Sequence, residues 1–186
     1  MTPSSSSAPP LAAIRGPLVL IGLMATGKTT IGRLLAERLG IGFRDSDADI
    51  ERDTGGVTVA GLVATAGADV MHRREAEHLL AALAARRPVV VAAAASTVDD
   101  ERCVAALLEP GVAVVWLRAS VATMASRFRS SPHRPTFGED PTALLAGQLE
   151  RRGPSFARLA DLVVDVDERS AAVVVDDIVA GLALSG

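Results

Sequence analysis

The glycine-rich segment GLMATGKT at residues 22–29 constrains the fold of this chain more than any other feature. It satisfies the pattern G-x-x-x-x-G-K-[ST], in which backbone N–H groups and a helix N-terminus surround phosphate groups. The pattern is meaningful only between a buried strand and a helix. Here the apolar run Pro17–Gly22 precedes it, and Lys28–Leu39 repeats apolar residues at helical spacing. The sequence therefore predicts a phosphate-binding loop at residues 22–30.

Lysine usage supports this prediction. The chain has 19 basic residues, and Lys28 is the only lysine among them. A compact ammonium group thus stands where phosphate oxygens need a point charge, which argues against an ordinary glycine turn. We expect Lys28 to bridge the β- and γ-phosphates of ATP and Thr29 to ligate Mg²⁺. The residues expected to bind the nucleotide in this loop are Ala25, Thr26, Gly27, Lys28, Thr29 and Thr30.

Short apolar runs alternate with helical patterns along the rest of the chain. Strands are expected at 41–44, 88–95, 111–117 and 161–166, and helices at 57–65, 69–86, 99–108, 121–128, 141–159 and 171–184. Most of these strands lack polar alternation, which indicates a parallel sheet covered on both faces. We predict an α/β fold, a three-layer α/β/α sandwich with a five-stranded parallel sheet, of the P-loop kinase type with a mobile lid.

Length and composition fit one soluble domain. A chain of 186 residues can bury about 70% of its unfolded surface, and its apolar runs are far shorter than the roughly 20 residues of a membrane span. Residues 1–16 are rich in Ser and Pro and lack the charged and apolar regions of a secretory signal. We expect a disordered tail at 1–16 and a single domain at 17–186.

Charge and cysteine content narrow the partners. The net charge of −3 argues against binding of nucleic acid or of an anionic membrane. The single cysteine, Cys103, cannot form an internal disulfide and is expected to be a small core residue. We expect a cytoplasmic protein by default, and a monomer.

The class of P-loop protein follows from what accompanies the loop. The guanine-binding motif N-K-x-D of GTPases needs a lysine that this chain lacks, so a GTPase is excluded. ATPase motors place an acid at the end of a buried strand, and only Asp165, on the last strand, offers that pattern. Asp45 and Asp47, after the second strand, are the better candidates for a metal-side and a substrate-side carboxylate.

The phosphate loop, the sequence Asp45-Ser46-Asp47 and the following A-D-I-E-R-D-T-G resemble, in this order, the shikimate kinase family of the nucleoside monophosphate kinase group. The resemblance runs from about Pro17 to the C-terminus. It implies an ATP- and Mg²⁺-dependent kinase of aromatic amino acid biosynthesis. It also implies that Asp45 helps to hold Mg²⁺ and that Asp47 lies beside the hydroxyl that is phosphorylated; a solvated helix cap is the alternative.

The resemblance also assigns four arginines. Arg127 and Arg134 match lid arginines that close over ATP, within a lid at about 126–140 that excludes water. Arg134 would neutralise charge on the transferring phosphoryl group. Arg152 matches an arginine that reaches the substrate carboxylate, and Arg169 falls in the loop that packs on adenine. A solvated basic surface is the alternative for each of them.

Two departures from the family lie on the helix and strand that border the acceptor. The family has an arginine three residues before a glutamate, where this chain has His72 and Glu75. Histidine offers one donor where arginine offers a fork, so carboxylate binding should weaken. A shift of two residues could instead present Arg74 with Glu77.

The second departure concerns three family glycines after the third strand, which are Ala92, Ala93 and Ala94 here. Their Cβ atoms would take space where the acceptor ring lies, so we expect a smaller or differently shaped pocket, with Ala93 and Ala94 beside the acceptor. A tightly packed strand end is the other interpretation. Phe156 also stands where the family often has Tyr.

Every departure of consequence lies on the acceptor side, whereas the nucleotide side is intact. We therefore expect transfer of the γ-phosphoryl group of Mg-ATP to a hydroxyl of a small metabolite. Lys28, Asp47 and Arg134 are the expected catalytic residues, with Asp47 orienting or deprotonating the hydroxyl. Shikimate is the first acceptor to consider; another cyclic polyol or a sugar acid, or nucleotide binding without transfer, are the alternatives.

Overall fold

The computed structural model describes residues 15–129 and 140–184. Strands and helices alternate along them in the predicted order. The elements are β1 (Pro17–Ile21), α1 (Lys28–Leu39), β2 (Gly42–Asp45), α2 (Ser46–Asp53), α3 (Val59–Ala66), α4 (Ala68–Ala84), β3 (Val89–Ala92), the 3₁₀-helix η1 (Ala95–Asp99), α5 (Glu101–Leu107), β4 (Ala113–Arg118), α6 (Val121–Arg129), α7 (Pro141–Leu159), β5 (Leu162–Asp165) and α8 (Ala171–Leu184). Most of the predicted tail and lid, including Arg134, lies outside the described residues.

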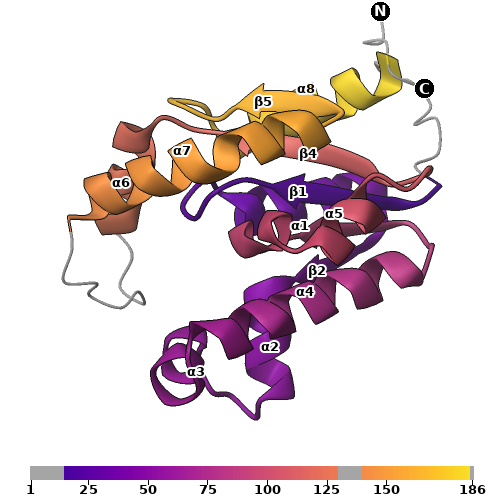
Figure 1. Ribbon diagram of the computed structural model, residues 1–186. Coiled ribbons are helices and arrows are strands. Elements are labelled where there is room, and N and C mark those ends of the chain that lie inside the picture. The colour runs from indigo at the N-terminus through magenta and orange to yellow at the C-terminus, as the bar shows by residue number, and fades with distance from the viewer. Residues whose placement is uncertain (1–14, 130–139, 185–186) are drawn as a thin grey trace, which may run out of the picture.

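The five strands form one parallel sheet in the order β2-β3-β1-β4-β5. The central strand β1 is buried along its whole length, and Leu18, Val19 and Leu20 have no exposed surface. Helices α4, α5 and α7 lie in front of the sheet and α1 and α8 behind it (Figure 1). The predicted three-layer α/β/α sandwich with five parallel strands is therefore confirmed.

The register of the strands brings three chain segments to one edge of the sheet. Asp45, at the end of β2, is paired with Ala92 at the end of β3, and Ala92 is paired with Leu20 near the end of β1. Because parallel strands share one carboxyl edge, the loop after β1, the acids after β2 and the alanines after β3 all meet there. This edge is the place to look for a site.

The third predicted strand is shorter than its apolar run. β3 ends at Ala92, and the chain turns into η1 at Ala95. The Thr97 hydroxyl donates to the Ala94 carbonyl at 2.7 Å, as does the Thr97 amide at 3.2 Å. These local bonds favour a tight turn over a further strand residue.

Helix α2 was not predicted, because only Ile50 of its residues joins an apolar cluster. It begins with the Asp45 side chain, which accepts from the amides of Asp47 and Ala48. It is then held by the Asp49 carboxylate, whose side chain is 8% exposed. Asp49 lies 2.5 Å from Nε of Arg44, and its ion pairs continue to Arg52 and His78.

A second, smaller apolar cluster joins α2, α3 and α4 beyond the β2 edge. It is formed by Ile50, Leu62 and Met71, and Figure 1 shows α2 and α3 in this place, at the bottom of the view. Asp49 Oδ2 lies 2.6 Å from Nε2 of the buried His78 on α4. The cluster and this bond together fix the helix that follows Asp45.

Replacing the Asp49 carboxylate should loosen this part of the molecule. Burial raises the pKa of Asp49, and hydrogen bonds to His78, Arg44 and Arg52 lower it. The lowering is the larger effect in sum, so the pKa ends below its ordinary value of 3.8. A lowered carboxyl pKa stabilises the fold above the ordinary pKa, and the stabilisation is lost as pH falls through the lowered value. We expect Asp49→Asn to reduce the free energy of unfolding by about 2 kcal/mol at neutral pH.

Urea unfolding of the unmodified protein and of Asp49→Asn between pH 7 and pH 2 measures the difference in their free energies of unfolding. This difference should shrink toward pH 2. Asp53→Asn is the control, because Asp53 ends the same helix with its side chain 66% exposed. An equal loss in both variants, or a loss that does not depend on pH, would contradict the assignment.

Cys103 lies in the main core with no exposed surface. Its thiol donates to the Ala76 carbonyl at 3.7 Å, and burial raises its pKa to about 11. A thiol this far from ionisation is unreactive at neutral pH. The prediction of a small core residue is confirmed.

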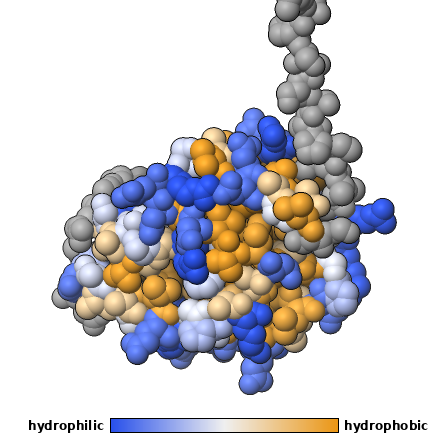
Figure 2. Space-filling view, turned by 90° about the horizontal axis from the view of Figure 1, so that it is seen from above, coloured by the Kyte–Doolittle hydropathy of each residue, from blue (hydrophilic) through white to orange (hydrophobic). Residues whose placement is uncertain are grey.

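The β5 side of the molecule has an apolar area framed by hydrophilic residues (Figure 2). β5 is an edge strand, and its residue Val163 is 39% exposed.

Across residues 15–129 and 140–184, no helix has both the length and the apolar character that a membrane crossing requires.

Candidate phosphate and acceptor site

The loop after β1 owes its shape to two glycines with positive φ. Gly22 has φ 137 and Gly27 has φ 95. A Cβ atom on Gly22 would stand 2.6 Å from the Leu117 carbonyl oxygen, which is closer than any side chain can approach. The motif glycine at 22 is thus required by both the backbone conformation and the neighbouring strand β4.

Ala25 occupies a left-handed position in the same loop, with φ 62. A residue with a Cβ atom is disfavoured there by about 1–2 kcal/mol. The sequence motif leaves this position open, so the strain is visible only in the structure. It places a small strain in the middle of the loop that should bind phosphate.

We expect Ala25→Gly to raise the free energy of unfolding by about 0.5–1 kcal/mol, because glycine adopts this conformation without the steric cost. Chemical denaturation measures the change. Ala146→Gly, at an exposed position inside α7, is the control and should lose about as much. A destabilised Ala25→Gly protein would mean that the methyl group contributes packing that outweighs the strain.

The side chain of Lys28 lies over the loop that follows β1. Nζ of Lys28 donates to the carbonyls of Gly22 and Leu23 at 2.8 and 2.9 Å. The hydroxyl of the buried Thr26 donates to the Leu23 carbonyl at 2.9 Å. The ammonium group therefore folds back over the loop, where phosphate oxygens could take the place of the carbonyls.

Thr29 and Asp45 are brought together, although sixteen positions separate them in the chain. The Thr29 hydroxyl donates to Oδ2 of Asp45 at 2.7 Å. Oδ1 of Asp45 accepts from the Asp47 amide at 3.1 Å and from the Ala48 amide at 3.4 Å. Asp45 is thus a helix cap and a partner of the phosphate loop at once, so the two interpretations of this residue do not exclude each other.

A hydroxyl and a carboxylate oxygen side by side suit Mg²⁺, which prefers oxygen ligands and usually takes only one or two from the protein. In the part of the chain that the structure describes, no group of three or more His, Cys, Asp or Glu residues could hold a metal ion. Thr29 and Asp45 therefore fit a metal ion that takes most of its ligands from phosphates and water.

Two of the arginines assigned to the nucleotide side lie around the phosphate loop and the β5–α8 turn. Arg127 on α6 donates to the Ala25 carbonyl at 3.4 Å and to the Val166 carbonyl at 2.9 Å. It links the loop after β1 to the segment after β5. Arg169 donates to the Asp165 carbonyl at 3.1 Å and pairs with Asp177 on α8.

The residues predicted to bind the acceptor surround Glu75, a buried carboxyl on α4 that accepts from the Ser96 hydroxyl. Burial raises the pKa of Glu75. The Ser96 hydrogen bond and the charges of His72 and Arg152 lower that pKa, while Asp47 raises it, and it ends above its ordinary value. Asp47, His72 and Arg152, which come from three different helices, therefore all lie within electrostatic reach of Glu75.

Helix α4 turns Glu75 inward and leaves Arg74 and Glu77 exposed. Glu77 acts on Arg102 of α5 instead. His72 is exposed as well, but its charge acts on the buried Glu75, which favours the unshifted pair of His72 and Glu75. The shifted pair of Arg74 and Glu77 has no support in this arrangement.

The alanines after β3 differ in what they can offer an acceptor. The Ala93 amide donates to the Leu20 carbonyl at 3.1 Å and is therefore used by the sheet. Ala93 is 1% exposed, whereas Ala94 is half-buried at the turn into η1. Of the two, Ala94 is the residue whose methyl group can limit the space above the sheet.

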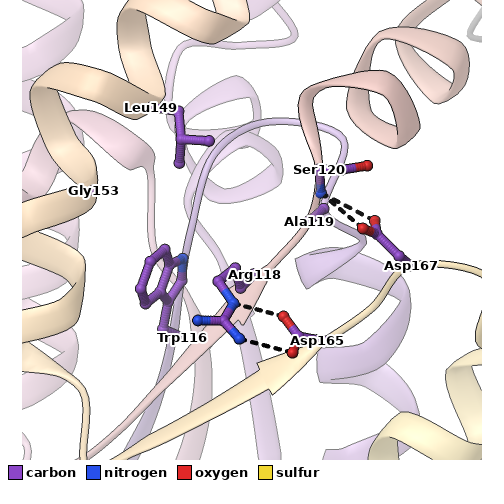
Figure 3. A pocket seen from close by; sticks show the side chains of 8 residues that line it. All are labelled: Trp116, Arg118, Ala119, Ser120, Leu149, Gly153, Asp165 and Asp167. Atoms are coloured by element: carbon purple, nitrogen blue, oxygen red, sulfur yellow. Dashed lines mark hydrogen bonds and ion pairs between the residues drawn. The ribbon is translucent and has the colours of Figure 1, made fainter.

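Sequence reasoning missed a pocket of about 390 Å³ at the ends of β4 and β5. Figure 3 shows the Arg118 guanidinium between the Trp116 ring and Asp165. Arg118 binds both carboxylate oxygens of Asp165, at 2.6 and 2.8 Å, and its Cζ lies 5.8 Å from the Trp116 ring centre. Asp165 is thus occupied by Arg118, and only the parallel register of β4 and β5 could have revealed this pair.

Comparisons with known proteins agree with this fold. A family model described as "Shikimate kinase" matches residues 24–183. The "Shikimate kinase" of Symbiobacterium thermophilum is 38% identical over 164 residues, 87% of this chain and 92% of that protein. The one of Pseudomonas entomophila is 39% identical over 162 residues, 87% of this chain and 92% of that protein. The solved structure of "Shikimate kinase from Acinetobacter baumannii in complex with shikimate" has a TM-score of 0.83 and 30% identity, and covers 95% of this chain and 98% of that chain.

Proposed function

The chain belongs to the shikimate kinase family, and we propose that it transfers the γ-phosphoryl group of ATP to a hydroxyl of shikimate, giving shikimate 3-phosphate. The observation that carries the proposal is the meeting of Lys28, Thr29 and Asp45 at the sheet edge, where Thr29 and Asp45 share a hydrogen bond of 2.7 Å. Phosphoryl transfer needs positioning and charge neutralisation more than covalent chemistry, and this arrangement offers both.

On the nucleotide side, the amides of residues 25–30 and the ammonium group of Lys28 would surround the phosphates. Arg127 would approach the nucleotide from α6 and Arg169 from the β5–α8 turn. Thr29 and Asp45 would hold Mg²⁺, which neutralises charge on the β- and γ-phosphates when it is bound. Arg134 would close over the transferring group as a lid residue.

On the acceptor side, Asp47 would orient or deprotonate the hydroxyl that attacks the γ-phosphorus. Its place near the positive end of α2 and within reach of Glu75 supports this role. Arg152 would bind the carboxylate of the acceptor with help from His72, and Ala93 and Ala94 would form one wall of the pocket.

Two substitutions favour a second candidate, an acceptor other than shikimate. His72 offers a single donor where the family has a fork, and the Ala94 methyl group would narrow an acceptor pocket above β3. A cyclic polyol or a sugar acid would be phosphorylated by the same nucleotide machinery. A nucleotide-binding protein without transfer activity is the third reading, and Asp47 argues against it.

ADP production in Mg-ATP, with and without saturating shikimate, tests the proposal. Strong stimulation by shikimate supports it. No stimulation, with ATP binding confirmed by calorimetry, refutes shikimate as the acceptor, and a panel of polyols and sugar acids then tests the second candidate. A protein that binds ATP and phosphorylates nothing in the panel would have the third function.

We also propose that the protein acts as a monomer and in the cytoplasm. The net charge of −3 and the lone cysteine are consistent with that compartment. Light scattering at working concentration tests the first statement, because a dimer would double the measured mass.

His72→Arg should strengthen the binding of shikimate, since arginine supplies a planar fork for a carboxylate. We expect KM for shikimate to fall about threefold to tenfold, with kcat and thermal stability little changed. Glu77→Gln is the control, because it also makes the net charge of the exposed face of α4 more positive by one. An unchanged KM in His72→Arg would mean that residue 72 does not face the carboxylate.

A further inference from the structure

Arg152 is the one buried arginine in the part of the chain that the structure describes, with 5% of its surface exposed. A buried guanidinium group requires an anionic partner, because an unpaired charge away from water is strongly destabilising. Asp99, the last residue of η1, is that partner. Nε and Nη2 of Arg152 both donate to Oδ2 of Asp99, at 2.9 and 2.7 Å.

The two partners differ in how easily they can part. The Arg152 side chain is 6% exposed and the Asp99 side chain 45%. A half-exposed carboxylate can exchange its partner for water at little cost, whereas the buried guanidinium group cannot. Arg152 can therefore lose Asp99 only to another anion.

The geometry of the pair leaves room for a stronger competitor. Both hydrogen bonds end on one oxygen of Asp99, so its carboxylate does not form the two-oxygen fork that makes arginine–carboxylate pairs strong. Arg151, whose side chain is 63% exposed, also lies 3.8 Å from the same oxygen and so shares it with Arg152. A small carboxylate that reaches both nitrogens with two oxygens would bind Arg152 better than Asp99 does.

The surroundings of Arg152 point to the acceptor pocket. The charge of Arg152 affects the pKa of Glu75, as do the charges of Asp47 and His72. Ser96, whose hydroxyl binds Glu75, lies three residues before Asp99 on the same short helix η1. Asp99 thus shares its short helix with the hydrogen-bond partner of Glu75 and contacts Arg152, two of the groups that surround the proposed acceptor position.

We propose that Asp99 is a specificity-determining residue that occupies Arg152 in the absence of acceptor and competes with the carboxylate of the acceptor. This inference rests on the proposed function, since it assumes that a carboxylate-bearing acceptor binds at Arg152. A carboxylate must displace Asp99 before it can bind, which raises KM. A neutral polyol leaves the pair of Asp99 and Arg152 intact, so the pair reduces the preference of the pocket for acids.

Asp99→Asn tests the inference. Because the variant leaves the buried guanidinium group without its anion, we expect its unfolding temperature to fall and shikimate to restore part of the loss. We expect KM for shikimate to fall about fivefold, the scale of one partly exposed ion pair, with kcat and KM for ATP unchanged. Asp99→Ser is the second variant, because asparagine can still accept a hydrogen bond from Arg152. Glu101→Gln is the matched control: it makes the same change of charge at an exposed residue two positions away and should leave all three constants unchanged.

An unchanged or higher KM for shikimate in the two Asp99 variants, with kcat retained, would overturn the inference and leave the proposed function standing. Asp99 would then orient Arg152 for the acceptor rather than compete with it. If neither the unmodified protein nor any variant phosphorylates shikimate, the proposed function fails and the inference fails with it. Calorimetric titration with shikimate in the presence of ADP gives the same comparison without turnover.

Discussion

We expect Lys28→Ala to lower kcat/KM for ATP by about 10²–10³-fold, the scale of losing one preorganised charge that stabilises the transition state. The reason is local, since Nζ of Lys28 sits over the phosphate loop on the carbonyls of Gly22 and Leu23. No second lysine exists in the chain to take over. Steady-state kinetics with shikimate and ATP measures the loss, and thermal unfolding should change little.

Arg38→Ala is the control for Lys28→Ala. Arg38 lies on the same helix α1 with its side chain 51% exposed and 3.8 Å from Asp176, so its loss should leave activity unchanged. The lone lysine allows a second, independent test by acylation and mass spectrometry. ATP should protect Lys28 from the reagent, and a variant that keeps full activity, or a lysine that ATP does not protect, would refute the phosphate assignment.

The elements predicted correctly from the sequence are those whose signal is local. The phosphate loop is set by glycines at fixed spacing, and the buried strands are continuous apolar runs that need no knowledge of their neighbours. The end of β3 was misjudged, because the apolar run continues to Ala95 while the hydrogen bonds of Thr97 turn the chain. Local polar bonds outweigh hydrophobicity at that point.

Side-chain pairs that depend on tertiary structure could not be predicted from the sequence. Helix α2 lacks a full apolar face and is held by the bond of Asp49 to His78 on α4. The pair of Arg118 and Asp165 follows from the register of β4 and β5, and the sequence of either strand alone does not predict it. Among the candidate site residues, the same holds for Arg152: its identity could be proposed from a resemblance, but its partner Asp99 lies 53 positions away.

The second large effect concerns Asp47, the residue assigned to the acceptor hydroxyl. Asp47 is exposed in the first turn of α2, beside the cap made by Asp45. A positioned carboxylate that orients or deprotonates the attacking hydroxyl contributes about 10²–10⁴-fold. We expect Asp47→Asn to lower kcat by about 10²-fold or more and to leave the affinity for ATP unchanged, because the phosphate loop and Lys28 are untouched.

Asp53→Asn separates this effect from a general loss of negative charge on α2. Asp53 closes the same helix and is paired only loosely with Arg52, at 3.6 Å, so the control should retain its kcat. Unfolding midpoints guard against a structural cause, since removing one acid from the first turn costs only about 0.3–1 kcal/mol. If Asp47→Asn keeps its kcat and raises only KM for shikimate, Asp47 binds the acceptor without acting on the hydroxyl. Catalysis would then rest on Lys28 and the other groups around the phosphates, with the attacking hydroxyl losing its proton directly to the phosphate oxygens.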